Sequence, residues 1–133
     1  MIAYDTNILI YAFEGTSPWA AAAEQVVRLG EQDGAVLSVL AWQELITGAA
    51  LRKDQSEERL VAALQVFGAT RFVPVTASIC RRAVGLTKRF GRGIFGYDAI
   101  LLATALEHKA TVFVTNDQVL LQLRLDGLEI RSL

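Results

Sequence analysis

The chain has 133 residues, of which 53% are hydrophobic, and its formal net charge is −1. This length predicts one domain, residues 1–133, with enough apolar material for a core. No apolar run approaches the roughly 18–20 residues that cross a membrane, and the N-terminus lacks the basic and apolar regions of a signal peptide. A single cysteine, Cys80, excludes an internal disulfide and is expected to be buried. A cytoplasmic protein is therefore expected.

The first half of the chain predicts short strands followed by helices. An apolar strand at 2–4 ends at Asp5, and Thr6 or Asn7 is expected to cap the helix that follows. Ser17 is expected to cap a second helix. The elements expected here are strands at 2–4 and 35–38 and helices at about 8–13, 19–29, 39–51 and 56–67.

The second half continues the alternation. Pro74 lies in a predicted strand and cannot donate a ladder hydrogen bond, which favours the edge of a sheet. Thr76 is expected to cap the next helix. The elements expected here are strands at 71–75, 111–115 and 128–131 and helices at 77–90, about 97–108 and 119–125. Alternating short apolar strands and amphipathic helices predict an α/β protein with a parallel sheet covered by helices on both faces.

The predicted helix from about 97 to 108 carries a charge on its apolar side. Leu101, Leu102 and Ala105 follow Asp98 by three, four and seven residues, so all four share one helical face. This face should pack on the core and bring the carboxylate inward. An isolated buried carboxylate is unfavourable, and it normally requires a partner or a metal ion.

Three further acids can reach the same region. Asp5 and Asp117 each follow a predicted strand, so they lie at one rim of the sheet if those two strands are neighbours. Glu44 lies early in a helix whose apolar face, from Leu40 to Leu51, should turn it inward. Each acid has a simpler alternative as a cap, a turn residue or a surface charge.

Four carboxylates in one cleft would repel each other and raise each other's pKa values, and a divalent cation would remove this difficulty. Ligands that are all oxygen, without His or Cys, select Mg²⁺ or Mn²⁺ over zinc. Such ions lower the pKa of water and stabilise charge on phosphate. The chemistry that this arrangement suggests is hydrolysis of a phosphodiester.

The charge of the chain is unevenly distributed. No acidic residue occurs between Glu58 and Asp98. A polyanion could dock on such a surface, although a solvated helix face is an equal alternative. Arg89 and Arg92 flank the segment that leads to Asp98, and they are the preferred candidates for contacts with the phosphate backbone of such a polyanion. The basic residues in this interval are Arg59, Arg71, Arg81, Arg82, Lys88, Arg89 and Arg92.

Several motifs resemble those of a known family. They are Asp5-Thr6-Asn7-Ile8-Leu9-Ile10-Tyr11-Ala12, the helical Glu44, Asp98-Ala99-Ile100-Leu101-Leu102-Ala103-Thr104-Ala105, and Thr115-Asn116-Asp117. In this order and spacing the whole chain resembles PIN-domain ribonucleases, and among them VapC-like toxins of type II toxin–antitoxin modules. The resemblance implies a three-layer α/β/α fold with about five strands in the order 3-2-1-4-5. It also implies Mg²⁺- or Mn²⁺-dependent RNA cleavage, a homodimer and inhibition by a cognate antitoxin.

Carried over by position, the resemblance makes Asp5, Glu44, Asp98 and Asp117 the acidic catalytic and metal-binding site. Asp5 and Asp98 are the preferred metal ligands. The supporting hydrogen-bonding residues are Thr6 and Asn116. Many relatives carry another Asp followed by an aromatic residue where this chain has Val119 and Leu120, which argues against a full second metal site.

Two alternatives share these features. The first is a PIN-type RNA-processing nuclease without a toxin role. The second is a non-catalytic, flavodoxin-like module that binds a metal in an acidic pocket.

Overall fold

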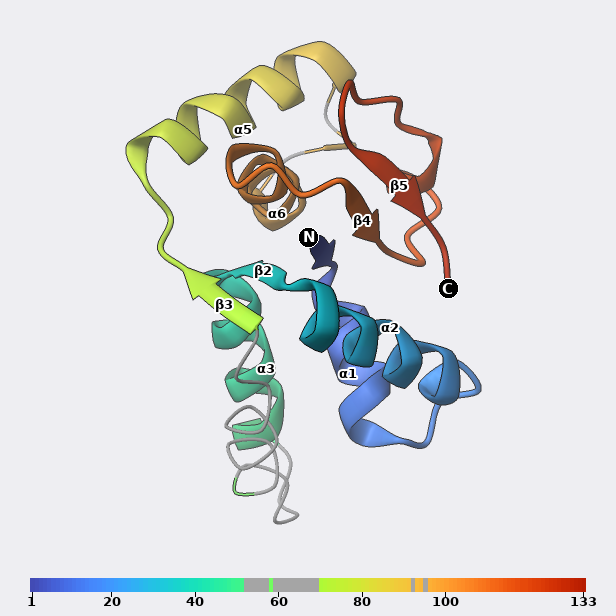
Figure 1. Ribbon diagram of the computed structural model, residues 1–133. Coiled ribbons are helices and arrows are strands. Elements are labelled where there is room, and N and C mark those ends of the chain that lie inside the picture. Colours follow the sequence, from blue (N-terminus) through green and yellow to red (C-terminus); the bar gives the residue numbers. More distant parts are fainter. Residues whose placement is uncertain (52–57, 59–69, 92, 95) are drawn as a thin grey trace.

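A parallel sheet of five strands forms the centre of the fold in the computed structural model (Figure 1). The structure describes residues 1–51, 58, 70–91, 93–94 and 96–133. Its spatial order is β3-β2-β1-β4-β5, which confirms the expected order 3-2-1-4-5. Flavodoxin-like folds have the order 2-1-3-4-5, so that alternative is excluded. The strands are β1 (Ile2–Tyr4), β2 (Ala35–Ser38), β3 (Thr70–Val73), β4 (Val112–Val114) and β5 (Glu129–Arg131).

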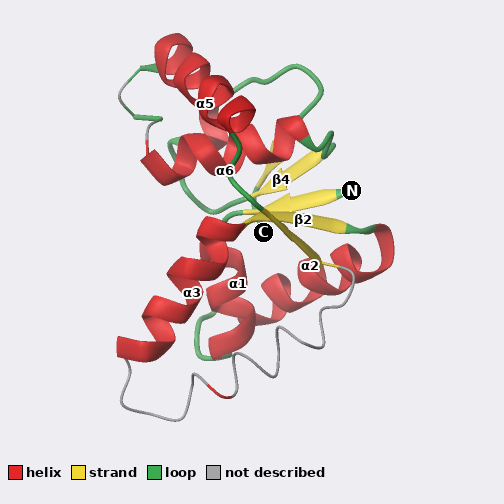
Figure 2. Ribbon diagram, turned by 90° about the vertical axis from the view of Figure 1, so that its left-hand side faces the viewer, coloured by secondary structure: helices red, strands yellow, loops and turns green. Residues whose placement is uncertain are grey.

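Helices cover both faces of the sheet, as expected for a parallel sheet whose inner strands β1, β2 and β4 are largely apolar. One layer holds α1, α2 and α3, and the opposite layer holds α5 and α6 (Figures 1 and 2). The fold is therefore three-layered, α/β/α. The helices are α1 (Thr6–Glu14), α2 (Ala20–Asp33), α3 (Val39–Leu51), α5 (Ala77–Phe90) and α6 (Gly96–Glu107), with a 3₁₀ turn η1 (Leu120–Gln122).

The register of the two central strands decides where the polar residues meet. β1 pairs in parallel with β4, and Tyr4 lies opposite Val114. The Asp5 backbone N–H then donates to the Val114 carbonyl at 2.8 Å. Because both strands end here, the residues that follow them share one rim of the sheet. The adjacency assumed from the sequence is confirmed.

The core lies on both sides of β1, β2 and β4. All four residues of β2 are buried, and so is Phe113 of β4. One glycine sets the distance between α2 and β1. A β-carbon added at Gly30 would lie 1.6 Å from Tyr4 Oη, so only glycine lets the helix approach this closely. Tyr4 is in turn the residue before Asp5, and this contact therefore supports the rim.

Several boundaries agree with the sequence predictions. The bounds of β2, α3 and α5 are those expected, and Thr76 caps α5 by accepting a hydrogen bond from the Ile79 N–H at 3.2 Å. Strand β3 is an edge strand, as Pro74 indicated, although it ends at Val73, one residue before the proline. None of the described helices is long and apolar enough to cross a membrane.

Other local predictions were wrong. Helix α1 begins at Thr6 with Asp5 at the N-cap position, so neither Thr6 nor Asn7 caps it. Helix α2 begins at Ala20, and the Ser17 hydroxyl accepts the Trp19 N–H in the preceding turn. The helix expected at 119–125 is only the turn η1. Cys80 is exposed on α5 rather than buried. The helix expected at 56–67 lies outside the described residues, apart from position 58.

Candidate active site

Asp5 is the most enclosed acid at the rim, with 8% of its surface exposed. The Thr115 hydroxyl donates to Asp5 Oδ2 at 2.7 Å. Burial raises the pKa of the Asp5 carboxyl, and the charge of Asp117 adds to the rise. The Thr115 hydrogen bond and the Thr6 and Asn7 backbone N–H groups oppose it. The Thr115 hydrogen bond therefore holds the Asp5 carboxylate in place, but no cation is among the groups that lower its pKa.

Asp117 lies just beyond β4 and is linked to Asp5 through Thr115. The Asp117 backbone N–H donates to Thr115 Oγ1 at 3.0 Å. Its own Oδ1 accepts the N–H groups of Val119 at 2.7 Å and Leu120 at 3.3 Å. Asp117 is thus the turn residue that the sequence allowed as an alternative, and its charge also acts on Asp5 and on Asp98.

Glu44 reaches the rim from α3. Its Oε2 accepts a hydrogen bond from the Thr6 hydroxyl, which joins α3 to the first turn of α1. Ala41 and Leu45 beside it are buried. The apolar face expected from Leu40 to Leu51 does not stay inward along its whole length, because Leu51 is 80% exposed. Only the first half of α3 packs on the core, and it is this half that carries Glu44.

Asp98 lies in the first turn of α6. Leu101, Leu102 and Ala105 are buried as predicted, and they anchor the helix face that carries Asp98. Burial raises the pKa of the Asp98 carboxyl to about 6, and the charges of the other three acids add to the rise. Among the described residues, none donates a hydrogen bond to this carboxylate. The acids that act on it are Asp5, Asp117 and Glu44.

The donor set fits a hard divalent cation, because all four side chains offer only oxygen. In the described part of the chain, however, no group of three or more His, Cys, Asp or Glu side chains is arranged closely enough to hold a metal ion. The repulsion between the acids and the absence of a formed metal site are compatible. Two charges about 7 Å apart still interact by roughly 2 kcal/mol, which is enough to raise a pKa. Mg²⁺ requires its ligand oxygens at about 2 Å, a much shorter distance. The carboxylates are near enough to repel and not yet close enough to coordinate together.

The remaining predicted residues have different surroundings. Thr6 holds Glu44, as expected of a supporting residue. Asn116 makes no side-chain hydrogen bond to the four acids in the described part of the chain, and its Oδ1 accepts the Leu133 N–H at 3.2 Å. Arg89 is exposed and lies 4.8 Å above the ring of Phe90. Arg92 lies outside the described residues.

Thr115 is a site residue that the sequence reasoning missed. It is fully buried, donates to Asp5 and accepts from Asp117. The available signal was its position: a hydroxyl at the end of a buried apolar strand needs a partner, and the neighbouring strand ends in an acid.

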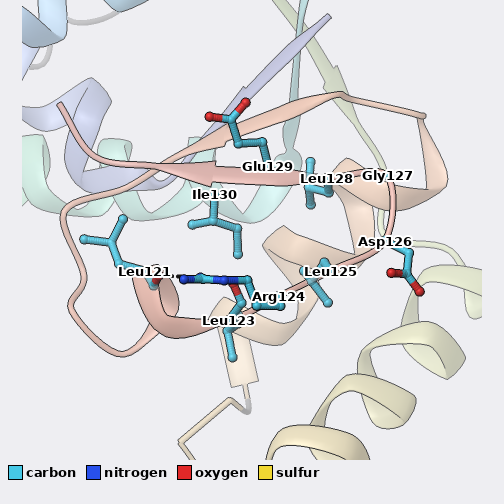
Figure 3. A pocket seen from close by; sticks show the side chains of 9 residues that line it. All are labelled: Leu121, Leu123, Arg124, Leu125, Asp126, Gly127, Leu128, Glu129 and Ile130. Carbon is cyan, nitrogen blue, oxygen red and sulfur yellow. Dashed lines mark hydrogen bonds between the residues drawn. The ribbon is translucent and has the colours of Figure 1, made fainter.

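A separate hollow of about 530 Å³ lies between η1 and β5 (Figure 3). The Arg124 guanidinium in it donates to the carbonyls of Leu121 at 3.3 Å and Leu123 at 2.9 Å. None of the four acids lines this hollow, so it does not belong to the rim. Its lining residues are Leu121, Leu123, Arg124, Leu125, Asp126, Gly127, Leu128, Glu129 and Ile130.

Comparison with protein families matches residues 2–125 to the PIN domain. The chain belongs to the PIN domain family. This match covers all four acids of the rim. No curated protein matched the chain.

Solved structures similar to this PIN domain include a toxin–antitoxin complex. A toxin–antitoxin complex from Klebsiella pneumoniae is 26% identical, with a TM-score of 0.73 and coverage of 96% of this chain and 95% of that one. FitAcB from Neisseria gonorrhoeae is 25% identical, with a TM-score of 0.70 and 88% of each chain covered. VapBC2 from Rickettsia felis, bound to a promoter DNA fragment, is 20% identical and supports the fold, with a TM-score of 0.71 over 99% and 98% of the chains.

Proposed function

We propose that this PIN domain is a metal-dependent endoribonuclease and the toxin of a type II toxin–antitoxin pair. The observation that carries the proposal is Asp98. It is a partly buried carboxylate with no hydrogen-bond donor among the described residues, and three other acids raise its pKa. A protein has little structural reason to keep such a group, whereas a cation site has a direct one.

In this proposal Asp5 and Asp98 are the principal ligands of Mg²⁺ or Mn²⁺, and Glu44 and Asp117 complete the acidic site. A bound cation would lower the pKa of water and stabilise charge on an RNA phosphate. The chain itself orients the acids. Thr115 fixes Asp5, and the Thr6 hydroxyl fixes Glu44. Asp98 has no such tether among the described residues, so its side chain can turn toward a ligand.

Arg89 and Arg92 would contact phosphates of the RNA. Arg89 is exposed at the end of α5, seven residues before α6 begins at Gly96. An arginine placed there offers a permanent charge and several donors to a phosphate. It would offset the repulsion between the acidic rim and a polyanionic substrate.

The proposed protein partners are a cognate antitoxin and a second copy of the chain. Support for the antitoxin comes from the toxin–antitoxin complex at 26% identity. Expression with and without the adjacent reading frame tests this part of the proposal. Growth arrest only in the absence of the neighbour, together with co-purification of the two proteins, is expected. Without either result, a PIN-type RNA-processing nuclease is the better assignment.

Replacing Asp98 tests the nuclease. Asp98→Asn keeps the size of the side chain and removes its charge, so we expect Mg²⁺- or Mn²⁺-dependent RNA cleavage to fall by at least about 100-fold. Cleavage of a labelled RNA, followed on gels with and without EDTA, provides the measurement. Asp33→Asn, which changes an exposed acid at the end of α2, is the matched control and should retain activity. Full activity of purified Asp98→Asn would overturn the assignment.

A further inference from the structure

Helix α5 presents an exposed surface of one charge. It carries four basic side chains and no acid, and all four are exposed. Arg82 is paired with Glu107 of α6 at 3.0 Å, and Glu107 also accepts a hydrogen bond from Ser78. No other basic residue of α5 is paired with an acid in the described part of the chain. The positive charge of this helix is therefore mostly not neutralised.

The unpaired cations lie along one side of the helix. Arg81 and Lys88 are seven residues apart, which places them on one face and about 10 Å apart along the axis. Val84 and Gly85 lie between them and are exposed. A β-carbon at Gly85 would meet nothing within 4 Å, so none of the described segments covers this part of the face. A ligand can run along it without obstruction.

This face leads to the acidic rim. Helix α5 lies over α6, with its C-terminal end toward β4 and β5 (Figure 1). In the segment that follows, a β-carbon at Gly93 would lie 3.3 Å from Val119, whose backbone N–H holds Asp117. The same segment ends at α6, whose first turn carries Asp98. The end of α5 that carries Lys88 and Arg89 is therefore joined by only five residues to the helix whose first turn carries Asp98.

We propose that this face of α5, which we call the α5 track, guides the backbone of single-stranded RNA to the acidic rim; the proposal rests on the nuclease function above. Four acids repel phosphates from the place where cleavage would occur, and a substrate needs an attractive surface next to it. A groove or strip of cations is the usual solution for binding a single strand without reading its sequence. If the basic face of α5 is instead only a solvent-exposed helix surface, it should bind no RNA.

Binding must be measured apart from cleavage. In the Asp98→Asn background, a 20-nucleotide single-stranded RNA is titrated at several NaCl concentrations, with fluorescence anisotropy as the readout. Arg81→Gln combined with Lys88→Gln should weaken binding about tenfold at low salt. Two lost phosphate contacts should also reduce the slope of log K against log salt by about 1.4 for a single strand. The matched control combines Arg28→Gln with Arg131→Gln, which removes the same charge from exposed sites on α2 and β5. The control should bind within twofold of its parent.

Cleavage supplies a second measurement. With Asp98 restored, the α5 double variant should lose efficiency on the 20-nucleotide RNA and keep it on a dinucleotide, whose single phosphodiester would occupy the acidic rim. An unchanged salt slope, an equal loss in the control, or no RNA binding by the parent would overturn the α5 track. Cleavage that depends on Asp98 with intact binding by the α5 double variant would leave the nuclease standing and remove the track. The opposite pattern, with weaker binding by the double variant but no cleavage by the wild type, would remove the nuclease alone.

Discussion

The acidic rim and the α5 track each gather charges of one sign, yet they differ in their access to water. Asp5 at the rim is 8% exposed, and burial, together with the charges of the other three acids, raises the pKa of Asp98 to about 6. Arg81, Lys88 and Arg89 of the track project into solvent. Water and salt screen exposed charges over roughly 10 Å, whereas enclosed charges keep most of their repulsion. Repulsion between the carboxylates therefore destabilises the rim, and a bound cation could remove it. The cations of the α5 track repel each other little and remain available to bind a polyanion weakly.

Among variants that leave all four acids in place, the largest expected effect comes from Thr115, which links Asp5 and Asp117. Thr115→Val keeps the shape of the side chain and removes both of its hydrogen bonds, to Asp5 and from Asp117. We expect RNA cleavage to fall by about 10- to 100-fold, equivalent to roughly 1.5–3 kcal/mol. The acidic limb of the pH–rate profile should also shift to higher pH, because Asp5 loses a hydrogen bond that lowers its pKa.

Two variants separate this role from a general packing effect. Thr115→Ser keeps the hydroxyl and should restore most of the activity and the original pH profile. Thr104→Val removes another buried hydroxyl, one that donates to the Ile100 carbonyl within α6. It should leave the pH profile in place. A profile that moves equally in Thr104→Val would contradict the positioning role of Thr115.

An intermediate effect is expected on stability at the rim. The pKa of Asp98 rises from 3.8 to about 6 on folding, so the folded chain holds this proton more tightly than the unfolded chain. The free energy of unfolding therefore falls as the pH rises from about 4 to 6, and the loss is complete above 6. A shift of this size corresponds to at most about 3 kcal/mol, and partial exposure reduces it to about 1–2.

Asp98→Asn removes this titration. In EDTA at pH 7.5 the variant should be about 1–2 kcal/mol more stable than the wild type, and at pH 4 the two should unfold alike. Denaturant unfolding at both pH values measures the difference. A variant that is less stable at pH 7.5 would mean that the Asp98 charge stabilises the fold, and the rim would then lose its contrast with α5.

The smallest expected effect belongs to α5. Gly85 is helical, and an added β-carbon would meet nothing, so Gly85→Ala should raise the free energy of unfolding by about 0.5–1 kcal/mol. Thermal or denaturant unfolding measures it. Gly30→Ala is the contrasting control, because its β-carbon would overlap Tyr4, and it should destabilise by roughly 1–3 kcal/mol. A loss of stability in Gly85→Ala would show that the α5 face is covered by another segment.

The sequence was most informative where local chemistry alone decides the structure. The bounds of α3 and α5 and the cap at Thr76 follow from helix periodicity and from one hydroxyl. The order of the strands was inferred from the family resemblance, because the sequence of an apolar strand does not indicate which strands pair with it. The position of Asp98 on an apolar face was readable, since the face and the acid belong to one helix.

The remaining features depend on how elements meet. The inner face of α3 was extrapolated to Leu51, but the end of the helix extends beyond the sheet (Figure 1), and Leu51 is exposed. The Thr6 hydroxyl was expected to cap its own helix, and it donates to Glu44, 38 residues away. Thr115 joins two acids only because β1 and β4 end side by side. Such contacts between distant segments leave no periodic trace in the sequence.

The close approach of α2 to β1 has a consequence for how the rim responds to change. Gly30 is buried, and a β-carbon there would overlap the hydroxyl end of the Tyr4 ring, while Asp5 follows Tyr4 in the chain. Any larger residue at position 30 must displace the Tyr4 ring, and one peptide bond joins Tyr4 to Asp5, the most enclosed of the acids. Gly30 on α2 has neither a charge nor a side chain, yet it thus limits how far Tyr4, and with it Asp5, can be displaced.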